Sequence, residues 1–234
     1  MKLADIENKI NALEGADAKI ESEIAALENT DELIRRGKQF CRDGEARLAL
    51  KCFLRAGKLY EAYGYLFAAQ IFGNVLCDGY AALYLYRRIT RCWSDGTAEQ
   101  QRFCKISIEE FNEPLEWQYP YKYYLEALRE QARIFRYGLE RVPADGRKAV
   151  YYYKRIVKSV LGTFDTYSLC DAERYERFVA DATNGNYATF ALHNIGNMYR
   201  DGEAGLNPNR RVAERYYHWL TNFLLPKRRP VTIY

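Results

Sequence analysis

The stretch GNVLCDG at residues 73–79 recurs as GNMYRDG at residues 196–202, 123 residues further along the chain. Both stretches keep Gly-Asn, three variable residues and then Asp-Gly. Glycine adopts positive φ without steric cost, and aspartate closes turns or caps helices. The repeated pattern therefore predicts the same event twice: a first helix, a tight turn at Asp-Gly, and a second helix.

Each stretch is followed by an alanine and then by a pair of large residues, as in Ala82-Leu-Tyr-Leu-Tyr and Ala213-Glu-Arg-Tyr-Tyr. The same arrangement occurs at Ala149 and, more loosely, at Ala49. The intervals between these alanines are 33, 67 and 64 residues, close to one, two and two units of a helical-hairpin repeat. Small residues let two helices approach closely, so we expect close helix crossings at Gly73, Ala82, Ala149, Gly196 and Ala213.

Tyrosines four positions after two of these alanines, Tyr86 and Tyr217, are expected to fill the gap to the neighbouring hairpin. Residues 142–153 (VPADGRKAVYYY) resemble the loop and second helix of a Sel-one-like repeat, a relative of the tetratricopeptide repeat. Residues 188–217 resemble the whole repeat, and residues 66–87 resemble it in part, with a shortened loop. The resemblance implies a right-handed α-solenoid that acts as a scaffold or adaptor between proteins.

The remaining sequence is typical of helices joined by short Gly or Asp turns, without a convincing strand pair. We therefore expect an all-α fold, with longer loops at residues 112–120 and 162–168. The expected organisation is an N-terminal amphipathic or coiled-coil segment (1–29), a helical repeat array (30–225) and a basic C-terminal tail (226–234). Helix starts are predicted at Asn29, Asp145 and Asn209, and Gly44, Gly57 and Gly79 are predicted to end helices.

Apolar residues recur at heptad spacing over residues 3–34, with Asp17 and Asp31 interrupting the seam. Gly15 followed by Asp17 leaves two interpretations open. The first is one long helix with a polar seam position, which would permit an oligomer through residues 1–29. The second is a chain that turns at residues 15–17 and folds back to cap the array.

The composition, with 48% hydrophobic and 28% charged residues, is that of an ordinary soluble protein. No segment approaches about 18 uninterrupted apolar residues, and the acidic first thirty residues do not resemble a targeting segment. We expect a cytoplasmic protein that binds no membrane. The six cysteines show no Cys-x-x-Cys spacing, which favours reduced thiols used as small hydrophobic residues.

Short catalytic and phosphate-binding motifs are missing from the sequence, which has no Gly-rich phosphate loop, Gly-x-Ser-x-Gly or His-Glu-x-x-His. The chain contains two histidines, His193 and His218. A nucleophile pair of Cys170 and His193 is conceivable, but no other residue pattern supports it. We expect neither a metal nor a cofactor, and we do not expect an enzyme.

In tetratricopeptide-like arrays, the first helix of each hairpin lines the concave side. Counting around the helix from Gly73 and from Gly196 gives two similar sets, each with a phenylalanine and an asparagine. Phenylalanine supplies apolar area, and asparagine can donate to and accept from a partner's backbone. The alternative is that both phenylalanines belong to the core. The candidate partner-binding residues are Phe67, Gln70, Asn74, Phe190, His193, Asn197 and Arg200, with Cys77 as a further position on the first helix.

A nucleic-acid-binding helical repeat is the alternative function, because the charge is unevenly distributed. Residues 1–30 carry a net charge of −4 in a chain of +4, so the remainder carries +8. Basic clusters at residues 87–91 and 154–158 lie beside tyrosines that could stack on bases. Against this function, the arginines fall mostly on second helices, where a solvated outer face would explain them, and acidic residues are interspersed.

Overall fold

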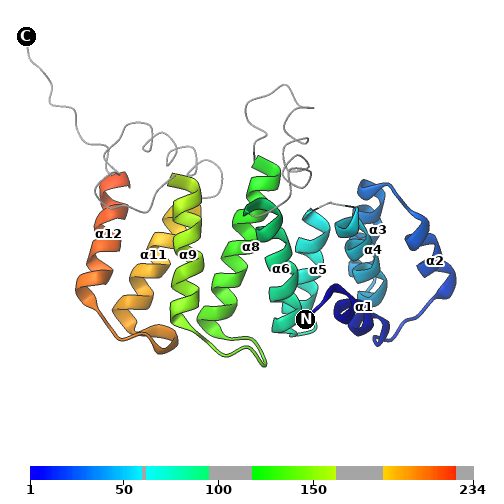
Figure 1. Ribbon diagram of the computed structural model, residues 1–234, viewed down its shortest axis with the longest axis horizontal. Coiled ribbons are helices and arrows are strands. Elements are labelled where there is room, and N and C mark those ends of the chain that lie inside the picture. The colour runs from blue at the N-terminus through cyan, green and yellow to red at the C-terminus, as the bar shows by residue number, and fades with distance from the viewer. Residues whose placement is uncertain (60–61, 95–117, 162–186, 225–234) are drawn as a thin grey trace, which may run out of the picture. The chain divides into compact units, whose positions relative to one another are not determined.

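A computed structural model describes residues 1–59, 62–94, 118–161 and 187–224 of the chain (Figure 1). Within these ranges the regular structure is helical, with no extended strand and a single isolated bridge between Leu139 and Val142. The predicted all-α fold class is confirmed. The predicted basic tail and the predicted loop at residues 162–168 lie outside the described residues, whereas residues 118–120, expected in a loop, begin a helix.

The chain divides into two compact units, and α8 (Gln118–Tyr137) contributes to both. Unit 1 comprises residues 1–130 and 139–142, and unit 2 comprises residues 131–138 and 143–234. The other helices of unit 1 are α1 (Leu3–Asn11), α2 (Ala18–Ala26), α3 (Thr30–Arg42), α4 (Ala46–Lys58), α5 (Ala62–Asn74) and α6 (Gly79–Ser94). The other elements of unit 2 are α9 (Gly146–Leu161), α11 (Tyr187–Asp201), the 3-10 turn η1 (Glu203–Gly205) and α12 (Arg210–Leu224).

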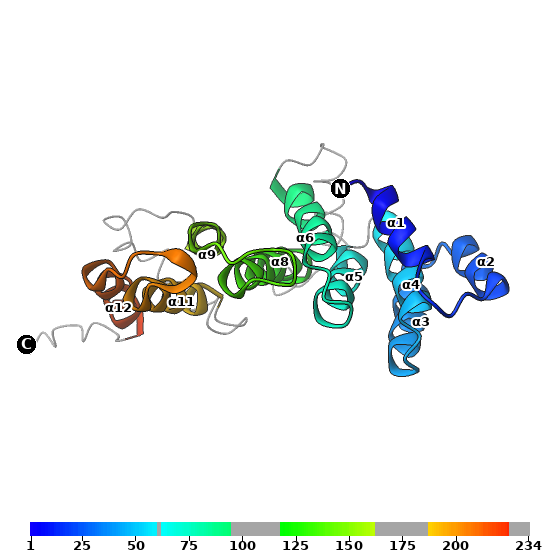
Figure 2. The ribbon, with the colours of Figure 1, turned by 90° about the horizontal axis from the view of Figure 1, so that it is seen from below.

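Helices that follow one another in the sequence also pack against one another. In unit 1, α3 packs on α4, α4 on α5 and α5 on α6 (Figure 2). In unit 2, α11 packs on both α9 and α12. Each unit is therefore built of helical hairpins stacked in sequence order, which is the packing pattern of a solenoid.

The crossing of α4 and α5 brings two backbones together. A Cβ atom added at Gly64 would lie 2.5 Å from the Phe53 carbonyl oxygen and 2.7 Å from the Gly57 nitrogen. A Cβ atom at Gly57 would overlap the Tyr65 ring at 2.6 Å. Gly57 therefore lies inside α4 because the crossing needs it, and the prediction that it ends a helix is wrong.

The N-terminal segment turns at residues 15–17, and the interpretation as one long helix is wrong. Gly15 has φ +80, and the Asp17 carboxylate caps α2 by accepting from the backbone of Lys19 and Ile20 at 3.0 Å. Both α1 and α2 pack on α4. Their apolar face is buried within unit 1, at Ile6, Ile10 and Ile24.

The repeat alanines share one structural position in their hairpins. Each alanine N–H donates to the carbonyl of the N-cap residue of its helix at 3.0 Å, and each alanine is at most 1% exposed. The alanines that repeat in the sequence therefore occupy the same position, four residues after the N-cap, in each second helix. The four pairs, alanine first, are Ala49 with Glu45, Ala82 with Asp78, Ala149 with Asp145, and Ala213 with Asn209.

Two second helices begin with a glycine that touches the loop of another hairpin. A Cβ atom at Gly79 would lie 2.8 Å from the Leu139 carbonyl oxygen, and one at Gly146 would lie 2.9 Å from that of Glu203. The preceding aspartate caps the helix in both cases, since Asp145, for example, accepts from the Lys148 N–H at 3.1 Å. Gly79 thus begins a helix, and the prediction that it ends one is wrong.

Candidate partner-binding surface

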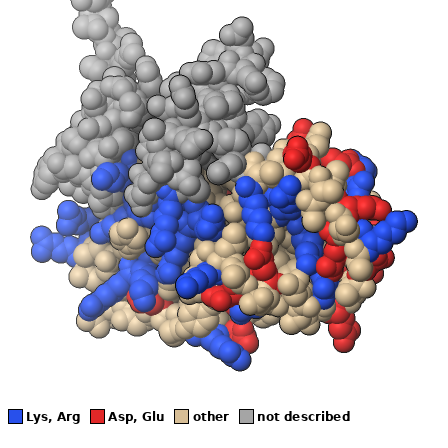
Figure 3. Space-filling model, turned by 45° about the vertical axis from the view of Figure 1, so that its right-hand side comes forward, with Lys and Arg blue, Asp and Glu red and all other residues tan. Residues whose placement is uncertain are grey.

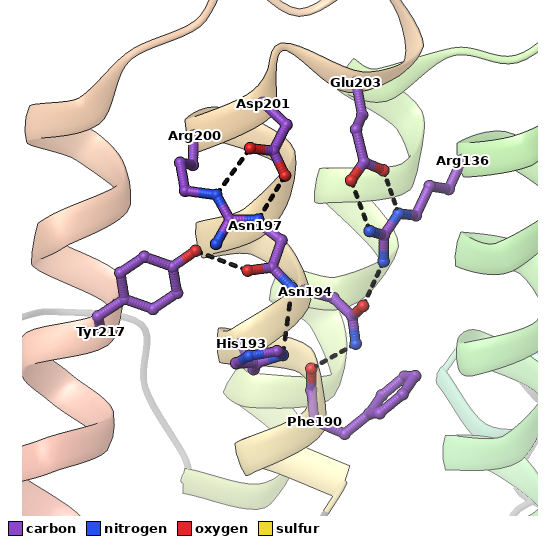
Figure 4. A network of polar contacts seen from close by, with 9 residues as sticks. All are labelled: Arg136, Phe190, His193, Asn194, Asn197, Arg200, Asp201, Glu203 and Tyr217. Atoms are coloured by element: carbon purple, nitrogen blue, oxygen red, sulfur yellow. Dashed lines mark hydrogen bonds and ion pairs between the residues drawn. The ribbon is translucent and has the colours of Figure 1, made fainter.

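The candidate surface of unit 2 lies on α11, which runs between α9 and α12 (Figure 4). Phe190 is 42% exposed, His193 and Arg200 are exposed, and Asn197 is half-buried. Spacings of three and four residues place these side chains on one side of a helix. The structure thus brings the four residues of the second predicted set onto a common face, and Phe190 is not enclosed in the core.

Asn197 is held by contacts within the chain. Its Oδ1 accepts a hydrogen bond from the Tyr217 hydroxyl at 2.6 Å, and its Nδ2 lies 3.3 Å from Nδ1 of His193. When the Asn197 amide donates to Nδ1, the proton of the neutral imidazole lies on Nε2. Asn197 therefore contacts two side chains, and in this tautomer the exposed His193 ring has an N–H donor on Nε2.

Tyr217 occupies the space left by Gly196. A Cβ atom at Gly196 would lie 2.5 Å from the Tyr217 Cε1 atom. The ring therefore fills a gap within its own hairpin, between α11 and α12. The expectation that Tyr217 fills the gap to a neighbouring hairpin is wrong. Gly196 on α11 has no side chain, and the Tyr217 ring packs into the space that this leaves.

Arg200 is engaged with the next residue in the chain. Its guanidinium donates to the Asp201 carboxylate at 2.7 and 2.6 Å, and both residues are exposed. This hydrogen bonding raises the pKa of Arg200 and lowers the pKa of Asp201. An exposed pair of this kind is screened by water, so it stabilises the fold little.

A partly buried ion pair that the sequence did not reveal lies next to this surface. The Arg136 side chain is only 9% exposed and binds the Glu203 carboxylate through two nitrogens, with Nη2 to Oε1 at 2.7 Å. Its Nη1 also donates to Asn194, whose amide donates to the Phe190 carbonyl at 2.7 Å. An arginine in the last turn of a helix is an ordinary sequence feature. No local pattern predicts that it binds a glutamate 67 residues away.

The first predicted set, on α5, is arranged differently. Phe67 is half-buried, with its ring stacked on Phe53 at 4.9 Å and against the edge of Tyr63 at 4.2 Å. Gln70 is half-buried, and the exposed Asn74 is the last residue of α5. Cys77 lies beyond the helix with φ +53. The expected helical position for Cys77 is therefore wrong, and Asn74 does not correspond to the mid-helix Asn197.

The thiols that the structure describes differ in burial. Cys52 is buried, which raises its pKa to about 12, whereas Cys41 and Cys77 are exposed and so do not serve as core residues. Cys170, the partner in the conceivable nucleophile pair, lies outside the described residues. Across the described ranges, no three His, Cys, Asp or Glu side chains gather as metal ligands. Nor does any helix in those ranges have the length and apolar content to cross a membrane.

A cavity of about 620 Å³ lies between α1, α2 and α4 in unit 1. Its charged rim groups bind one another. Lys58 pairs with Glu7, and Lys51 lies 3.1 Å from Glu21. Arg55 donates to the Leu27 carbonyl at 3.1 Å. These contacts fasten the N-terminal segment to α4 and leave the rim with mixed charge.

Three second helices carry Lys and Arg without Asp or Glu. On the first of them, α4, cations bind Glu7 and Glu21 of α1 and α2, and the other two are α6 and α9. The sequence of α6 has three arginines and that of α9 has five lysines and arginines, and neither helix contains Asp or Glu. Burial lowers the pKa of Lys154 on α9. Elsewhere the charges mix: on the face drawn in Figure 3, Asp and Glu side chains are interspersed among Lys and Arg.

No protein-family model and no curated protein matches the chain. Among solved structures, the chain is similar to that of a Sel1 repeat protein from Oxalobacter formigenes. The match covers 87% of this chain and 88% of that chain, with 19% sequence identity and a TM-score of 0.26. At this identity and score, we carry over no residue role and no partner from that protein.

Proposed function

We propose that the protein is a non-catalytic scaffold or adaptor that binds a protein or peptide on the exposed face of α11. The observation that carries the proposal is Phe190, a large apolar side chain that is 42% exposed on the same face as the His193 ring. An exposed aromatic residue beside a hydrogen-bond donor is a common anchor for a partner chain. The resemblance of residues 142–153 and 188–217 to Sel-one-like repeats also supports it.

Contacts within unit 2 hold the α11 face in place, which favours binding. Tyr217 fills the Gly196 notch on one side, and the Arg136–Glu203 ion pair fixes the turn that follows α11. Surfaces held in place before binding lose less conformational entropy when a partner arrives. The same contacts hold Asn194, which fixes the Phe190 carbonyl.

The residues on this face have separate roles in the proposal. Phe190 supplies apolar area, and the His193 Nε2–H donates to a carbonyl oxygen of the partner. Asn197 is a positioning residue, because its amide already binds Tyr217 and His193. Its replacement by alanine should therefore weaken both binding and folding, unlike a residue whose hydrogen bonds form only with the partner.

Unit 1 offers a second surface for the same function, with Phe67, Gln70 and Asn74 on α5. Its aromatic side chain is less exposed than Phe190, and we therefore rank it second. For the N-terminal segment we propose the role of a cap, supported by the packing of α1 and α2 on α4 and by the burial of Ile6 and Ile24.

The test is affinity capture from nuclease-treated extract of the native host, with quantitative mass spectrometry. We compare the wild-type chain with Phe190→Ser and His193→Ala. A partner that contacts α11 should be depleted at least about tenfold by either variant, since an anchor residue contributes 2 kcal/mol or more.

The matched control is Tyr151→Ser, which removes an aromatic side chain of similar exposure from α9. The control should retain the partner, and thermal unfolding should show that all three variants are folded at the temperature of the assay. Protein partners captured equally by wild type and both α11 variants would overturn the assignment of the surface. Failure to enrich any protein would overturn the proposed function.

A further inference from the structure

The helices α6 and α9 carry the same ten-residue pattern in the same structural register. It reads ALYLYRRITR at residues 82–91 and AVYYYKRIVK at residues 149–158, and it begins at the repeat alanine in both. We call this pattern the cationic tyrosine motif. Its third position is a tyrosine, its fifth is a tyrosine buried to 1% exposure, and its sixth, seventh and tenth positions are basic.

The charge of these helices is not balanced within the helix. On α3, by contrast, Glu32 accepts hydrogen bonds from Arg35 and Arg36 at 2.7 Å, which is how a solvated helix face pairs its charges. Like charges one turn apart repel one another and destabilise a helix. Neither α6 nor α9 has an acidic residue to offset this repulsion. Helix α4 also has none, but its cations bind Glu7 and Glu21 of α1 and α2. A bound anionic ligand would offset the repulsion between the basic side chains of α6 and of α9.

Several cations of the motif are available to such an anion. Arg87 and Arg91 on α6 and Lys158 on α9 are exposed. Within the described parts of the chain, none of these three side chains has an ion-pair partner. The same holds for the exposed Arg147, one turn before Tyr151 on α9. The motif therefore presents positive charge to solvent in both units.

The tyrosine at the third position adds a flat apolar surface between the charges. Tyr151 is 56% exposed, and the Arg155 guanidinium lies 5.9 Å from the centre of its ring. Arg147 and Arg155 flank it at a distance of one helical turn, about 5.4 Å, in each direction. An acidic peptide would use the cations alone, whereas a single-stranded nucleic acid uses both features, phosphates on cations and a base on the ring.

We infer that the cationic tyrosine motif of α9, with Arg147 one turn before Tyr151, is a contact site for single-stranded nucleic acid, in which Tyr151 stacks on a base while Arg147 and Lys158 bind phosphates. We expect the site to bind nucleic acids of any base sequence, because it offers charges and the face of a ring but no set of donors and acceptors that matches one base. It lies on a second helix, so it is separate from the α11 surface proposed for a protein partner.

The test measures binding of fluorescein-labelled oligouridylate of about 12 nucleotides, by anisotropy, from about 50 mM salt upward. The wild-type chain should bind, and its affinity should fall as salt rises. Arg147→Gln with Lys158→Gln, both on α9, should weaken binding by about tenfold or more and reduce the salt slope by about 1.4, for two lost phosphate contacts. The charge-preserving pair Arg147→Lys with Lys158→Arg should bind as the wild type does.

Two further comparisons identify the surface and the ligand. Arg141→Gln with Arg211→Gln removes the same charge from exposed positions outside the motif and should change affinity by less than about twofold. Tyr151→Leu should weaken oligouridylate binding by about fivefold or more, and Tyr151→Phe should not.

Three outcomes would overturn the inference. One is no binding at the lowest salt, and another is equal loss in the α9 and control pairs. The third is displacement by polyglutamate at equal charge together with an unaffected Tyr151→Leu, which would assign the surface to acidic polypeptides.

Discussion

The two Gly-Asn-x-x-x-Asp-Gly stretches have the same spacing but different structures. In unit 1, α5 ends at Asn74, and Asp78 caps α6 after a four-residue connection. In unit 2, α11 continues through Asn197 to Asp201, and Gly202 turns the chain with φ +68. The second connection has eight residues. One sequence pattern thus marks a helix start in one unit and a helix end in the other.

The difference shows which sequence spacing carries structural information. Counting back from the repeat alanines, Asp78-Gly79 corresponds to Asn209-Arg210 and not to Asp201-Gly202. Register is set by the second helix, because its N-cap and alanine must meet the neighbouring helix. The connection varies in length because loop closure costs little more when a few residues are added.

The largest effect is expected at the two glycines that open the stretches. Gly196→Leu should destabilise unit 2 by about 3 kcal/mol, because its Cβ would lie 2.5 Å from the Tyr217 ring, which the Asn197 bond holds in place. Gly73→Ala should be neutral or stabilising by up to about 1 kcal/mol, since its Cβ has ordinary contact with Ala82 at 3.6 Å. Urea unfolding measures both, and equal losses would contradict the difference between the crossings.

The next effect concerns the turn after the second stretch. Glu203→Gln should destabilise the protein by about 1.5 to 3 kcal/mol, because it removes the charge that binds the nearly buried Arg136. Glu214→Gln is the control, since its partner Arg210 is 89% exposed, and it should cost less than about 1 kcal/mol. Thermal unfolding compares the two variants. A control that costs as much as Glu203→Gln would show that the buried pair does not hold the turn.

The two aspartates of the stretches should differ as well. Asp78→Ala should cost about 1 kcal/mol, because it removes the cap of α6, whereas Asp201→Ala should change stability little. Burial raises the pKa of Asp78, but hydrogen bonds from Lys9 and the Ala81 N–H outweigh it and lower the pKa overall. The stabilisation by the charged carboxylate is therefore complete above the usual aspartate pKa and is lost as pH falls through the lower folded value. Unfolding at about pH 6 and pH 3 should show the cost of Asp78→Ala shrinking in acid.

The smallest of these effects is expected from a single hydroxyl. Tyr217→Phe keeps the ring in the Gly196 notch but removes the hydrogen bond to Asn197, so it should cost about 0.5 to 1 kcal/mol. In the binding assay, the loss of orientation at Asn197 should weaken capture of an α11 partner. A variant as stable as the wild type would show that Asn197 does not depend on α12.

Local features of this fold could be predicted from the sequence, and contacts between distant residues could not. The caps at Asn29, Asp145 and Asn209 are confirmed, because a capping side chain binds the backbone two or three residues away. The repeat alanines are confirmed for the same reason, since each alanine N–H binds the carbonyl of the residue four positions earlier.

The errors arose where the deciding contact is distant in the sequence. The sequence pattern indicates a turn at Gly79, but the residue is a glycine because the Leu139 carbonyl oxygen leaves no space for a side chain. Arg136 reads as a solvated helix end, but Glu203 and Asn194 enclose it. The sequence predicted which residues share the candidate face of α11, but not which of their polar groups are already bonded within the chain. The Asn197 amide accepts a hydrogen bond from Tyr217 on α12. The residue spacing along α11 does not predict this contact.

The backbone crossing at Gly64 also bears on the order in which unit 1 folds. Gly64 meets the Phe53 carbonyl, a residue only eleven positions earlier in the chain. Forming this contact closes a short loop, so its entropic cost is small and its rate is high. A nucleus formed by α4 and α5 would let the helices before and after them add from both sides. Gly64→Ala should then slow refolding more than it accelerates unfolding, which stopped-flow kinetics can measure.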